Sequence, residues 1–183
     1  MGKRALVLVD IQNDYFPGGK WTLHGIEAAA DNAARVLEAA RAAGDLVVHV
    51  RHEFASADAP FFTTGSEGAR IHPKVAVREG EAVILKHQVN SFRDTELEAL
   101  LRGRSIEQLT IVGNMSHLCI DAITRASVDL GFSATVIHDA CASRDLEFDG
   151  TQVPAAQVHA AIMASLAFAY AKVQSTEAYL AEH

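Results

Sequence analysis

Short apolar runs alternate with longer segments of helical spacing along the chain. The strand candidates are residues 5–9, 46–50, 82–85, 109–112 and 133–138, with a sixth near 171–174. The helix candidates are residues 26–43, 95–102, 116–131 and 155–170. Continuous apolar strands are typical of parallel sheets covered on both faces. The alternation therefore predicts an α/β protein: a doubly wound three-layer sandwich with a six-stranded, mostly parallel sheet.

Residues 51–77 interrupt this pattern with a long polar segment that contains Gly and Pro. A loop of this length in a compact domain is usually functional or lies at an interface. We expect it either to line the site or to contact another subunit. For Glu67, Arg70 and His72 within it, ion pairing is the favoured role, including pairing across a subunit interface.

Composition narrows the class of protein. The 183 residues are 49% hydrophobic and 21% charged, which predicts one globular domain over residues 1–183. The net charge of −7 argues against nucleic acid or an anionic membrane as partner. No apolar run is long enough to span a bilayer, and no signal-peptide pattern is present. Two cysteines make no disulfide framework, so we expect a cytoplasmic protein.

The segment from Leu109 to Gly131 carries the first candidate chemistry. Its apolar run breaks at Gly113-Asn114, and helical spacing then continues to Gly131. Ser116 stands where an N-cap is expected, which places Cys119 in the first helical turn. The amides and dipole there predict a lowered thiol pKa, and the same amides could hold an oxyanion. The alternative is a buried core thiol.

Two charged residues follow other predicted strands. Asp10 comes directly after the first strand and Lys86 directly after the third. Ligands of such sheets bind outside the carboxyl ends of the strands, so both residues should open onto the same edge as Cys119. A carboxylate that takes the thiol proton and an ammonium that stabilises the thiolate would suit nucleophilic catalysis.

Four segments together resemble the isochorismatase-like cysteine hydrolases. They are residues 10–16 (DIQNDYF), 86–92 (KHQVNSF), 113–119 (GNMSHLC) and 139–143 (DACAS), the last followed by a helix that carries His159. The resemblance covers essentially the whole chain, in order and at family-like spacing. It implies a six-stranded parallel sheet, a frequent oligomer and an Asp–Lys–Cys triad, here Asp10, Lys86 and Cys119.

The resemblance also implies a mechanism. Asp10 would act as general base, and Cys119 would attack an amide carbonyl. The backbone N–H groups of Met115 and Cys119 would form the oxyanion hole, after a cis peptide at Asn114–Met115. The expected activity is hydrolysis of a C–N bond in a small amide, ureide or carbamoyl compound, with no cofactor.

Departures from the family refine this expectation. Nicotinamidases carry a metal-binding Asp-x-His motif after the second strand, where this chain has Arg51-His52-Glu53. His49, His52 and His72 are scattered, so we expect structural roles for them and no metal. Isochorismatases cleave a vinyl ether without a nucleophilic cysteine, so Cys119 favours an amidase. Ser116 replaces the usual Thr and keeps the hydroxyl.

Several residues are candidates for the substrate pocket, with core packing or subunit contact as the alternative for any of them. They are Gln12, Tyr15, Phe16, Trp21, Phe54, Phe61, Ser91 and Ser116. Gln12 could instead brace the loop that follows Asp10. His117 neighbours the nucleophile but should point elsewhere, and we interpret Cys141 as structural.

The helix predicted over residues 155–170 is apolar nearly all round. Such a helix is buried in a core or covered by another subunit, and for one domain of this size we expect a homo-oligomer, a dimer or tetramer. Three functions stay open: a metal-independent cysteine amidohydrolase, an isochorismatase-type vinyl-ether hydrolase, and a catalytically silent or redox-responsive binding protein of the same fold.

Overall fold

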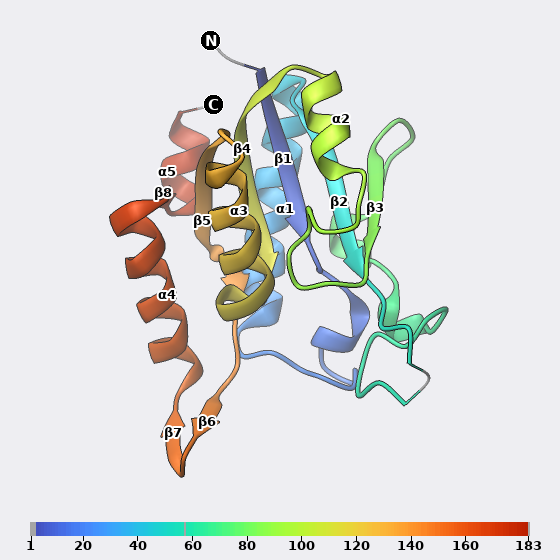
Figure 1. Ribbon diagram of the computed structural model, residues 1–183, viewed down its shortest axis with the longest axis vertical. Helices are drawn as coiled ribbons and strands as arrows, with labels where there is room; N and C mark the ends of the chain where they lie inside the picture. Colours follow the sequence, from blue (N-terminus) through green and yellow to red (C-terminus); the bar gives the residue numbers. More distant parts are fainter. Residues whose placement is uncertain (1–2, 57, 183) are drawn as a thin grey trace.

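A six-stranded sheet forms the centre of the protein. The computed structural model describes residues 3–56 and 58–182. The strands are β1 (Lys3–Val9), β2 (Leu46–His52), β3 (Ala82–Lys86), β4 (Ile106–Asn114), β5 (Ser133–Ala142) and β8 (Ala171–Gln174). They lie in the order β3-β2-β1-β4-β5-β8, and every neighbouring pair is parallel. The order reverses between β1 and β4 (Figure 1).

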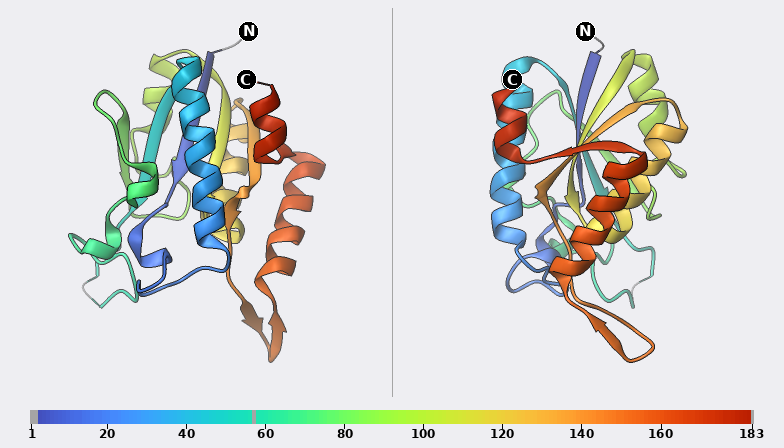
Figure 2. Two further views of the ribbon diagram at one scale, coloured as in Figure 1. Left: turned by 180° about the vertical axis from the view of Figure 1, so that it is seen from behind. Right: turned by 90° about the vertical axis from the view of Figure 1, so that its left-hand side faces the viewer.

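Helices cover both faces of this sheet (Figure 2). The helices α1 (Ile26–Ala43) and α5 (Thr176–Ala181) lie on one face. On the other face lie α2 (Leu97–Gly103), α3 (Asp121–Asp129) and α4 (Ala155–Ala169). The predicted doubly wound α/β sandwich is therefore confirmed. No helix among the described residues is long and apolar enough to cross a membrane.

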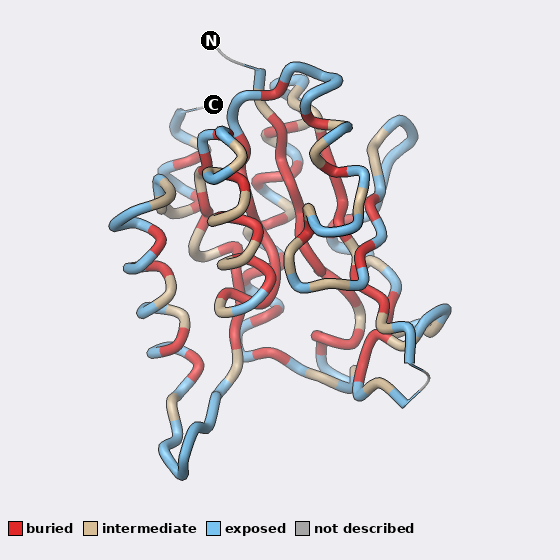
Figure 3. The backbone as a smooth tube through the Cα atoms, viewed as in Figure 1, coloured by how far each residue is buried: buried red, intermediate tan, exposed pale blue. Residues whose placement is uncertain are grey.

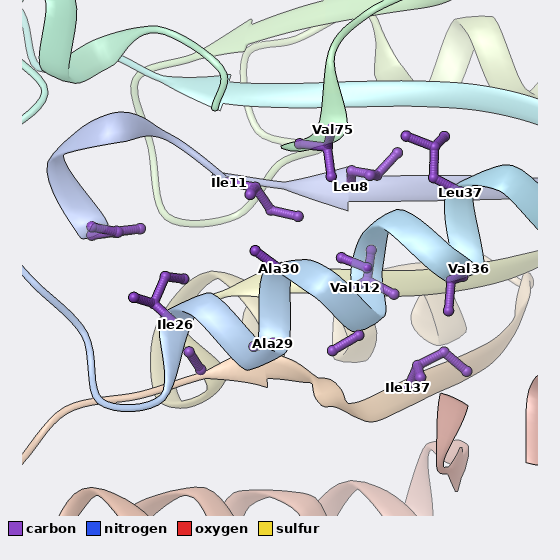
Figure 4. Packing of buried hydrophobic residues seen from close by; sticks show 14 of the residues in the cluster. Leu8, Ile11, Ile26, Ala29, Ala30, Val36, Leu37, Val75, Val112 and Ile137 are labelled. Atoms are coloured by element: carbon purple, nitrogen blue, oxygen red, sulfur yellow. The ribbon is translucent and has the colours of Figure 1, made fainter. Parts of the chain in front are cut away.

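The residues of β1 from Ala5 to Val9 are all apolar because both faces of this strand are buried. Leu6 and Leu8 pack into the cluster beneath α1, whereas Ala5, Val7 and Val9 pack into the cluster on the opposite face. Figure 4 shows Leu8 with Val36 and Leu37 of α1 in the first of these layers. Successive side chains of a strand point to opposite faces, so a strand buried on both faces needs apolar residues at every position.

Element boundaries follow the predictions to different degrees. Helix α1 and strand β8 have the predicted bounds, and α2 begins at Leu97, two residues after the predicted start. The prediction missed α5 and the hairpin of β6 (Leu146–Phe148) and β7 (Thr151–Val153). The hairpin is mostly exposed (Figure 3), so no apolar pattern marks it. Its Asp149-Gly150 turn, with both φ values positive, was the available signal.

The segment around Cys119 differs from the predicted single helix. Ser116–Ile120 forms a π-helical turn, named η4, and α3 begins only at Asp121. Ser116 is the first residue of this turn and not its N-cap, because Met115 takes the cap position. Its hydroxyl donates to the Ala142 carbonyl at 3.1 Å and contacts His159 Nδ1 at 2.7 Å. The predicted N-cap role of Ser116 is therefore wrong.

Helix α4 is buried on one side only within the single chain. Val158, Met163 and Leu166 pack inward, whereas Phe168 is 93% exposed. Phe148 in the neighbouring hairpin is 84% exposed. The described chain thus leaves an apolar surface along α4 uncovered, consistent with the nearly all-apolar sequence of this helix.

Candidate active site

The three residues predicted at the sheet edge do meet there. Asp10 follows β1, Lys86 ends β3, and Cys119 lies in η4 after β4. Lys86 Nζ lies 2.9 Å from Asp10 Oδ2 and donates to Cys119 Sγ at 3.3 Å. A carboxylate oxygen of Asp10 lies within 4.8 Å of the same sulfur. Each of the three residues is at most 4% exposed, so a carboxylate, an ammonium and a thiol share one buried space.

The backbone at Asp10 is fixed from two neighbouring strands. Its φ is +52°, in the left-handed region that Asp tolerates better than most residues. The Asp10 N–H donates to the Val50 carbonyl at 2.9 Å, and its carbonyl accepts from Asn114 Nδ2 at 3.3 Å. These bonds tie the carboxylate-bearing turn to the ends of β2 and β4.

Gly113 allows β4 to approach β1 beside the site. A Cβ atom at this position would lie 2.0 Å from the Val9 carbonyl oxygen, and its φ of +121° also favours glycine. The following Asn114–Met115 peptide bond is cis. Asn114 Oδ1 accepts from Ala142 N–H at 3.1 Å, so one amide side chain links β4 to both β1 and β5.

The electrostatics of Cys119 differ from the prediction. Burial, followed by the negative charge of Asp10, raises the pKa of the Cys119 thiol well above its ordinary value, and Lys86 only partly opposes this rise. The prediction of a lowered pKa is therefore wrong, since desolvation outweighs the helix-terminus effect. Burial on its own would lower the pKa of Lys86, but the charge of Asp10, together with that of Cys119 in its thiolate form, raises it overall. The resting site therefore pairs a neutral thiol with an ammonium.

Most of the aromatic pocket candidates form one cluster. Phe61 lies at its centre, with ring centroids 5.7 Å from Tyr15, 4.7 Å from Trp21 and 5.2 Å from Phe54. The Phe54 ring also lies 4.4 Å from the imidazole of His52, whose Nδ1 is 2.9 Å from Lys86 Nζ, so the cluster lies beside the catalytic candidates. Burial, followed by the negative charge of Asp10, raises the pKa of Tyr15 well above its ordinary value. Phe54 and Phe61 belong to the loop 51–77, so part of that loop packs next to the site.

The four other pocket candidates have different surroundings. The Gln12 side chain is fully buried, and its amide bonds the backbone of His52 at both its N–H and carbonyl. Gln12 therefore braces the loop and has no free group for substrate. The Ser116 hydroxyl is likewise occupied, by the Ala142 carbonyl and His159 Nδ1. Phe16 stacks on His72 at 3.6 Å and lies in the core beneath α1. Ser91 is buried, and its pocket role stays a prediction.

Two residues that the sequence analysis did not select lie at or near the site. His52 was expected to have a structural role, but its Nδ1 lies 2.9 Å from Lys86 Nζ. The Arg144 guanidinium lies 4.0 Å above the Trp21 ring, and its charge acts on Tyr15 and His117. Within the described residues Arg144 forms no ion pair. No motif pointed to Arg144. His52 stands where nicotinamidases carry their Asp-x-His motif, but its contact with Lys86 arises only through folding.

The remaining histidines, and the charged residues of the loop 51–77, have different partners. His49 contacts Glu81 at 2.9 Å, away from the site, and His117 contacts Ser143 Oγ at 2.8 Å. Arg70 and Glu67 form an exposed ion pair, whereas His72 stacks on Phe16 instead. The expected ion-pairing group therefore lacks His72.

One set of potential metal ligands occurs among residues 3–56 and 58–182. Asp10, His52 and Cys119 offer oxygen, nitrogen and sulfur atoms that all lie within 4.8 Å of one another. The Lys86 ammonium contacts one such atom from each of the three. It therefore occupies the position at which a cation would be held.

Comparisons with known proteins identify the family and support the fold. Residues 4–178 match the model of the isochorismatase domain. The isochorismatase family protein YddQ of Bacillus subtilis is 46% identical over 176 residues, 96% of this chain and 98% of its own. A crystal structure of an isochorismatase hydrolase from Oleispira antarctica has a TM-score of 0.95 at 57% identity, covering 98% of this chain and 97% of its own.

A relative with a named activity also matches. The maleamate amidohydrolase of Pseudomonas putida is 28% identical over 159 residues, 78% of this chain and 73% of its own. The family model covers almost the whole chain, and the solved structure from Oleispira antarctica has the same fold. The chain therefore belongs to the isochorismatase family of hydrolases.

Proposed function

We propose that this protein is a cysteine hydrolase that cleaves a C–N bond of a small amide, ureide or carbamoyl compound through a thioester at Cys119. One observation carries the proposal: Lys86 Nζ contacts both Asp10 Oδ2 and Cys119 Sγ in a buried site. A carboxylate and an ammonium beside a thiol are the groups that can remove its proton and stabilise the resulting thiolate.

The reaction runs in two halves. The thiol proton moves to the Asp10 carboxylate as sulfur bonds to the carbonyl carbon, and backbone N–H groups of Met115 and Cys119 hold the oxyanion. The C–N bond then breaks, and the amine leaves with the proton from Asp10. In the second half a water molecule, deprotonated by Asp10, attacks the thioester carbon. The acid is released, and the proton returns to sulfur. Lys86 stays charged throughout.

The substrate we propose is an amide that also carries a negative charge. Arg144 supplies a cation on the aromatic cluster, held over Trp21 at 4.0 Å, and it forms no ion pair with the rest of the described chain. Guanidinium groups bind carboxylates through paired hydrogen bonds. The name of the maleamate amidohydrolase relative supports the same class, because maleamate is an amide with a carboxylate.

The test measures ammonia or amine release from a panel of small amides, ureides and carbamoyl compounds. We expect release by the wild type and by Cys141→Ala, and release at least a thousandfold slower by Cys119→Ala. Cys141 is the matched control, since it is the other buried free cysteine. Circular dichroism checks that both variants fold. Undiminished release by folded Cys119→Ala would contradict the thioester mechanism.

The two alternatives predict different results in the same assay. An isochorismatase-type hydrolase would cleave a vinyl ether without needing the Cys119 thiol. A silent binding protein of this fold would release nothing from any compound, and its Cys119 would not react with iodoacetamide. Amide cleavage that depends on Cys119 is therefore the result that separates the proposal from both.

We also propose that the protein forms a homo-oligomer through the exposed face of α4. Phe168 and Phe148 are the two most exposed large hydrophobic residues of the described chain, and burying apolar area of this kind is the usual driving force for association. Light scattering should show a dimer or tetramer, and Phe168→Asp should lower the mass. A monomeric wild type would contradict this proposal.

A further inference from the structure

Four acceptor atoms surround the Lys86 ammonium. They are Asp10 Oδ2 at 2.9 Å, His52 Nδ1 at 2.9 Å, the Gln88 carbonyl at 3.1 Å and Cys119 Sγ at 3.3 Å. An ammonium group has three N–H donors. The geometry of a hydrogen bond is met at His52 Nδ1, the Gln88 carbonyl and Cys119 Sγ, whereas Asp10 Oδ2 contacts the ammonium as an ion pair. Two of the four, the histidine nitrogen and the peptide carbonyl, belong to no part of the predicted triad.

The contact with Lys86 determines the state of His52. A lysine ammonium can only donate, so Nδ1 must accept, and the ring proton must lie on Nε2. This tautomer is assigned from the hydrogen-bond partners. A protonated ring would instead place two cations in contact. In agreement, burial and the charge of Lys86 lower the pKa of His52 to about 4, which keeps the ring neutral at physiological pH.

The fold holds His52 firmly in this position. Gln12 accepts a hydrogen bond from the His52 N–H at 2.8 Å and donates one to the His52 carbonyl at 2.8 Å. The Phe54 ring lies 4.4 Å from the imidazole, and His52 is only 5% exposed. Hydrogen bonds to Gln12 therefore hold the backbone of His52, and packing against Phe54 holds its ring, whose Nε2 has no hydrogen-bond partner among the described residues.

The position of β2 explains why such an acceptor is needed. Lys86 is on β3, and β2 separates β3 from β1, which leads into Asp10. The lysine side chain must therefore cross the end of β2, where His52 is paired with Lys86 in the strand register. An apolar residue at this place would remove the acceptor that β2 offers to the ammonium.

We propose that His52 is a positioning residue for Lys86, whose Nδ1 holds the ammonium between Asp10 and Cys119. This inference rests on the proposed function. His52 does not touch the reacting carbonyl or transfer a proton. It accepts one ammonium N–H and so keeps Nζ within reach of Cys119 Sγ, where the ammonium stabilises the thiolate when Cys119 is deprotonated.

The test follows alkylation of Cys119 by iodoacetamide, located by mass spectrometry, from pH 6 to 10. This readout needs no substrate, so it can fail independently of the proposed amidase activity. The titratable groups that face these residues are Asp10, Lys86 and Tyr15 around Cys119, and Lys86, Asp10 and His87 around His52. Below the thiol pKa the rate is proportional to the thiolate fraction.

Three variants distinguish the effect of the Nδ1 acceptor on the alkylation rate from the effect of the aromatic ring. His52→Phe keeps an aromatic ring and removes Nδ1, so we expect alkylation about tenfold slower at pH 8, equivalent to a thiol pKa about one unit higher. His52→Asn keeps an acceptor close to the Nδ1 position and should stay within about threefold of the wild type. His49→Asn, a buried histidine on the same strand that contacts Glu81, should not change the rate.

In the amidase assay His52→Phe should lower kcat about tenfold and leave KM within about threefold, because the substrate contacts remain. Alkylation of His52→Phe at the wild-type rate would overturn the proposal, as would His52→Asn as slow as His52→Phe. If His52→Phe does not fold, as judged by circular dichroism, His52→Leu takes its place, and a slow but folded His52→Asn overturns the proposal by itself.

Discussion

The surroundings of Cys119 and Cys141 are the most informative comparison within this protein. Both thiols are buried, at 4% and 6% exposure. Burial raises the pKa of each, to about 12 for Cys141 and well above the ordinary value for Cys119. The Cys141 thiol donates to the Ile137 carbonyl at 3.4 Å. Cys119 instead has an ammonium at 3.3 Å and a carboxylate beside it.

The comparison shows that burial does not distinguish a nucleophile from a core thiol. Only the charged neighbours do, and they act in opposite directions on Cys119. Asp10 raises the pKa of the thiol, whereas Lys86 lowers it. The carboxylate therefore adds to the effect of burial on the resting thiol, and in the proposed mechanism it is also the base that accepts the thiol proton. Cys141 has no comparable pair among its described neighbours.

The largest expected effect comes from removing the charge of Asp10. In Asp10→Asn the proposed general base is lost, and amide turnover should fall by about 10²- to 10⁴-fold. The same change removes the negative charge that raises the pKa of Cys119. Iodoacetamide should therefore react with Cys119 faster in the variant than in the wild type, while its reaction with Cys141 stays unchanged.

Amide turnover should thus fall while alkylation of Cys119 rises, and this opposite change separates the two roles of the carboxylate. A variant that had merely lost its structure would alkylate both cysteines rapidly, so Cys141 is the internal control, and the peptides are quantified separately by mass spectrometry. Slower alkylation of Cys119 in Asp10→Asn would show that the carboxylate favours the thiolate at rest, and it would contradict a thiol pKa raised by Asp10.

A smaller effect is expected at Arg144, which follows Cys141 by three residues yet acts on the aromatic cluster beside Cys119. Arg144→Gln should lower kcat/KM about tenfold or more for a monoamide of a dicarboxylic acid, since a hydrogen bond to a charged group contributes roughly 1.5–3 kcal/mol. The corresponding neutral diamide should be little affected. Kinetic assays with both substrates measure the ratio of kcat/KM for the monoamide to kcat/KM for the diamide.

The matched control for Arg144 is Arg102, which also lies over an aromatic ring, Phe132, at 5.1 Å. Arg102→Gln should leave the ratio of the two substrates unchanged. If Arg144→Gln lowered kcat/KM equally for the monoamide and for the diamide, Arg144 would have no role in binding negative charge. Its contact with Trp21 would then be purely structural.

The smallest effect concerns stability at high pH. A native thiol with a raised pKa stabilises the fold below the unfolded pKa of about 8.5, and this contribution is lost as pH rises towards the native value. For Cys141 that window extends from about 8.5 to about 12. Within it the free energy of unfolding should fall by up to about 1.4 kcal/mol per pH unit from this group.

Urea unfolding of the wild type and Cys141→Ala at several pH values between 8 and 10 measures this contribution. Both curves should fall, because other groups titrate too, but the curve of the variant should be less steep. Parallel curves would mean that Cys141 titrates normally in the folded protein, and then burial would not raise its pKa as described.

Much of the fold was decided by local pattern. Every side chain of β1 is apolar from Ala5 to Val9 because both faces of that strand are covered, and α1 begins and ends where its spacing and Gly44 predict. The β6–β7 hairpin was not predicted, because strands outside the core have no periodic apolar pattern. Its Asp149-Gly150 turn was nevertheless visible in the sequence.

The sequence by itself also determined which residues meet at the site. Asp10, Lys86 and Cys119 follow strands of one parallel sheet, and the carboxyl ends of those strands share one edge. This rule needs only the strand assignments and no knowledge of side-chain contacts. It therefore placed the carboxylate, the ammonium and the thiol together correctly.

Only the tertiary structure decided how these groups interact. The raised pKa of Cys119 depends on desolvation by residues from several elements, which the local helix-terminus argument omits. The contact of His52 with Lys86, and the use of Gln12 to hold His52, depend on β2 lying between β1 and β3. Burial and through-space distance are properties of the packed chain, so no local pattern could have supplied them.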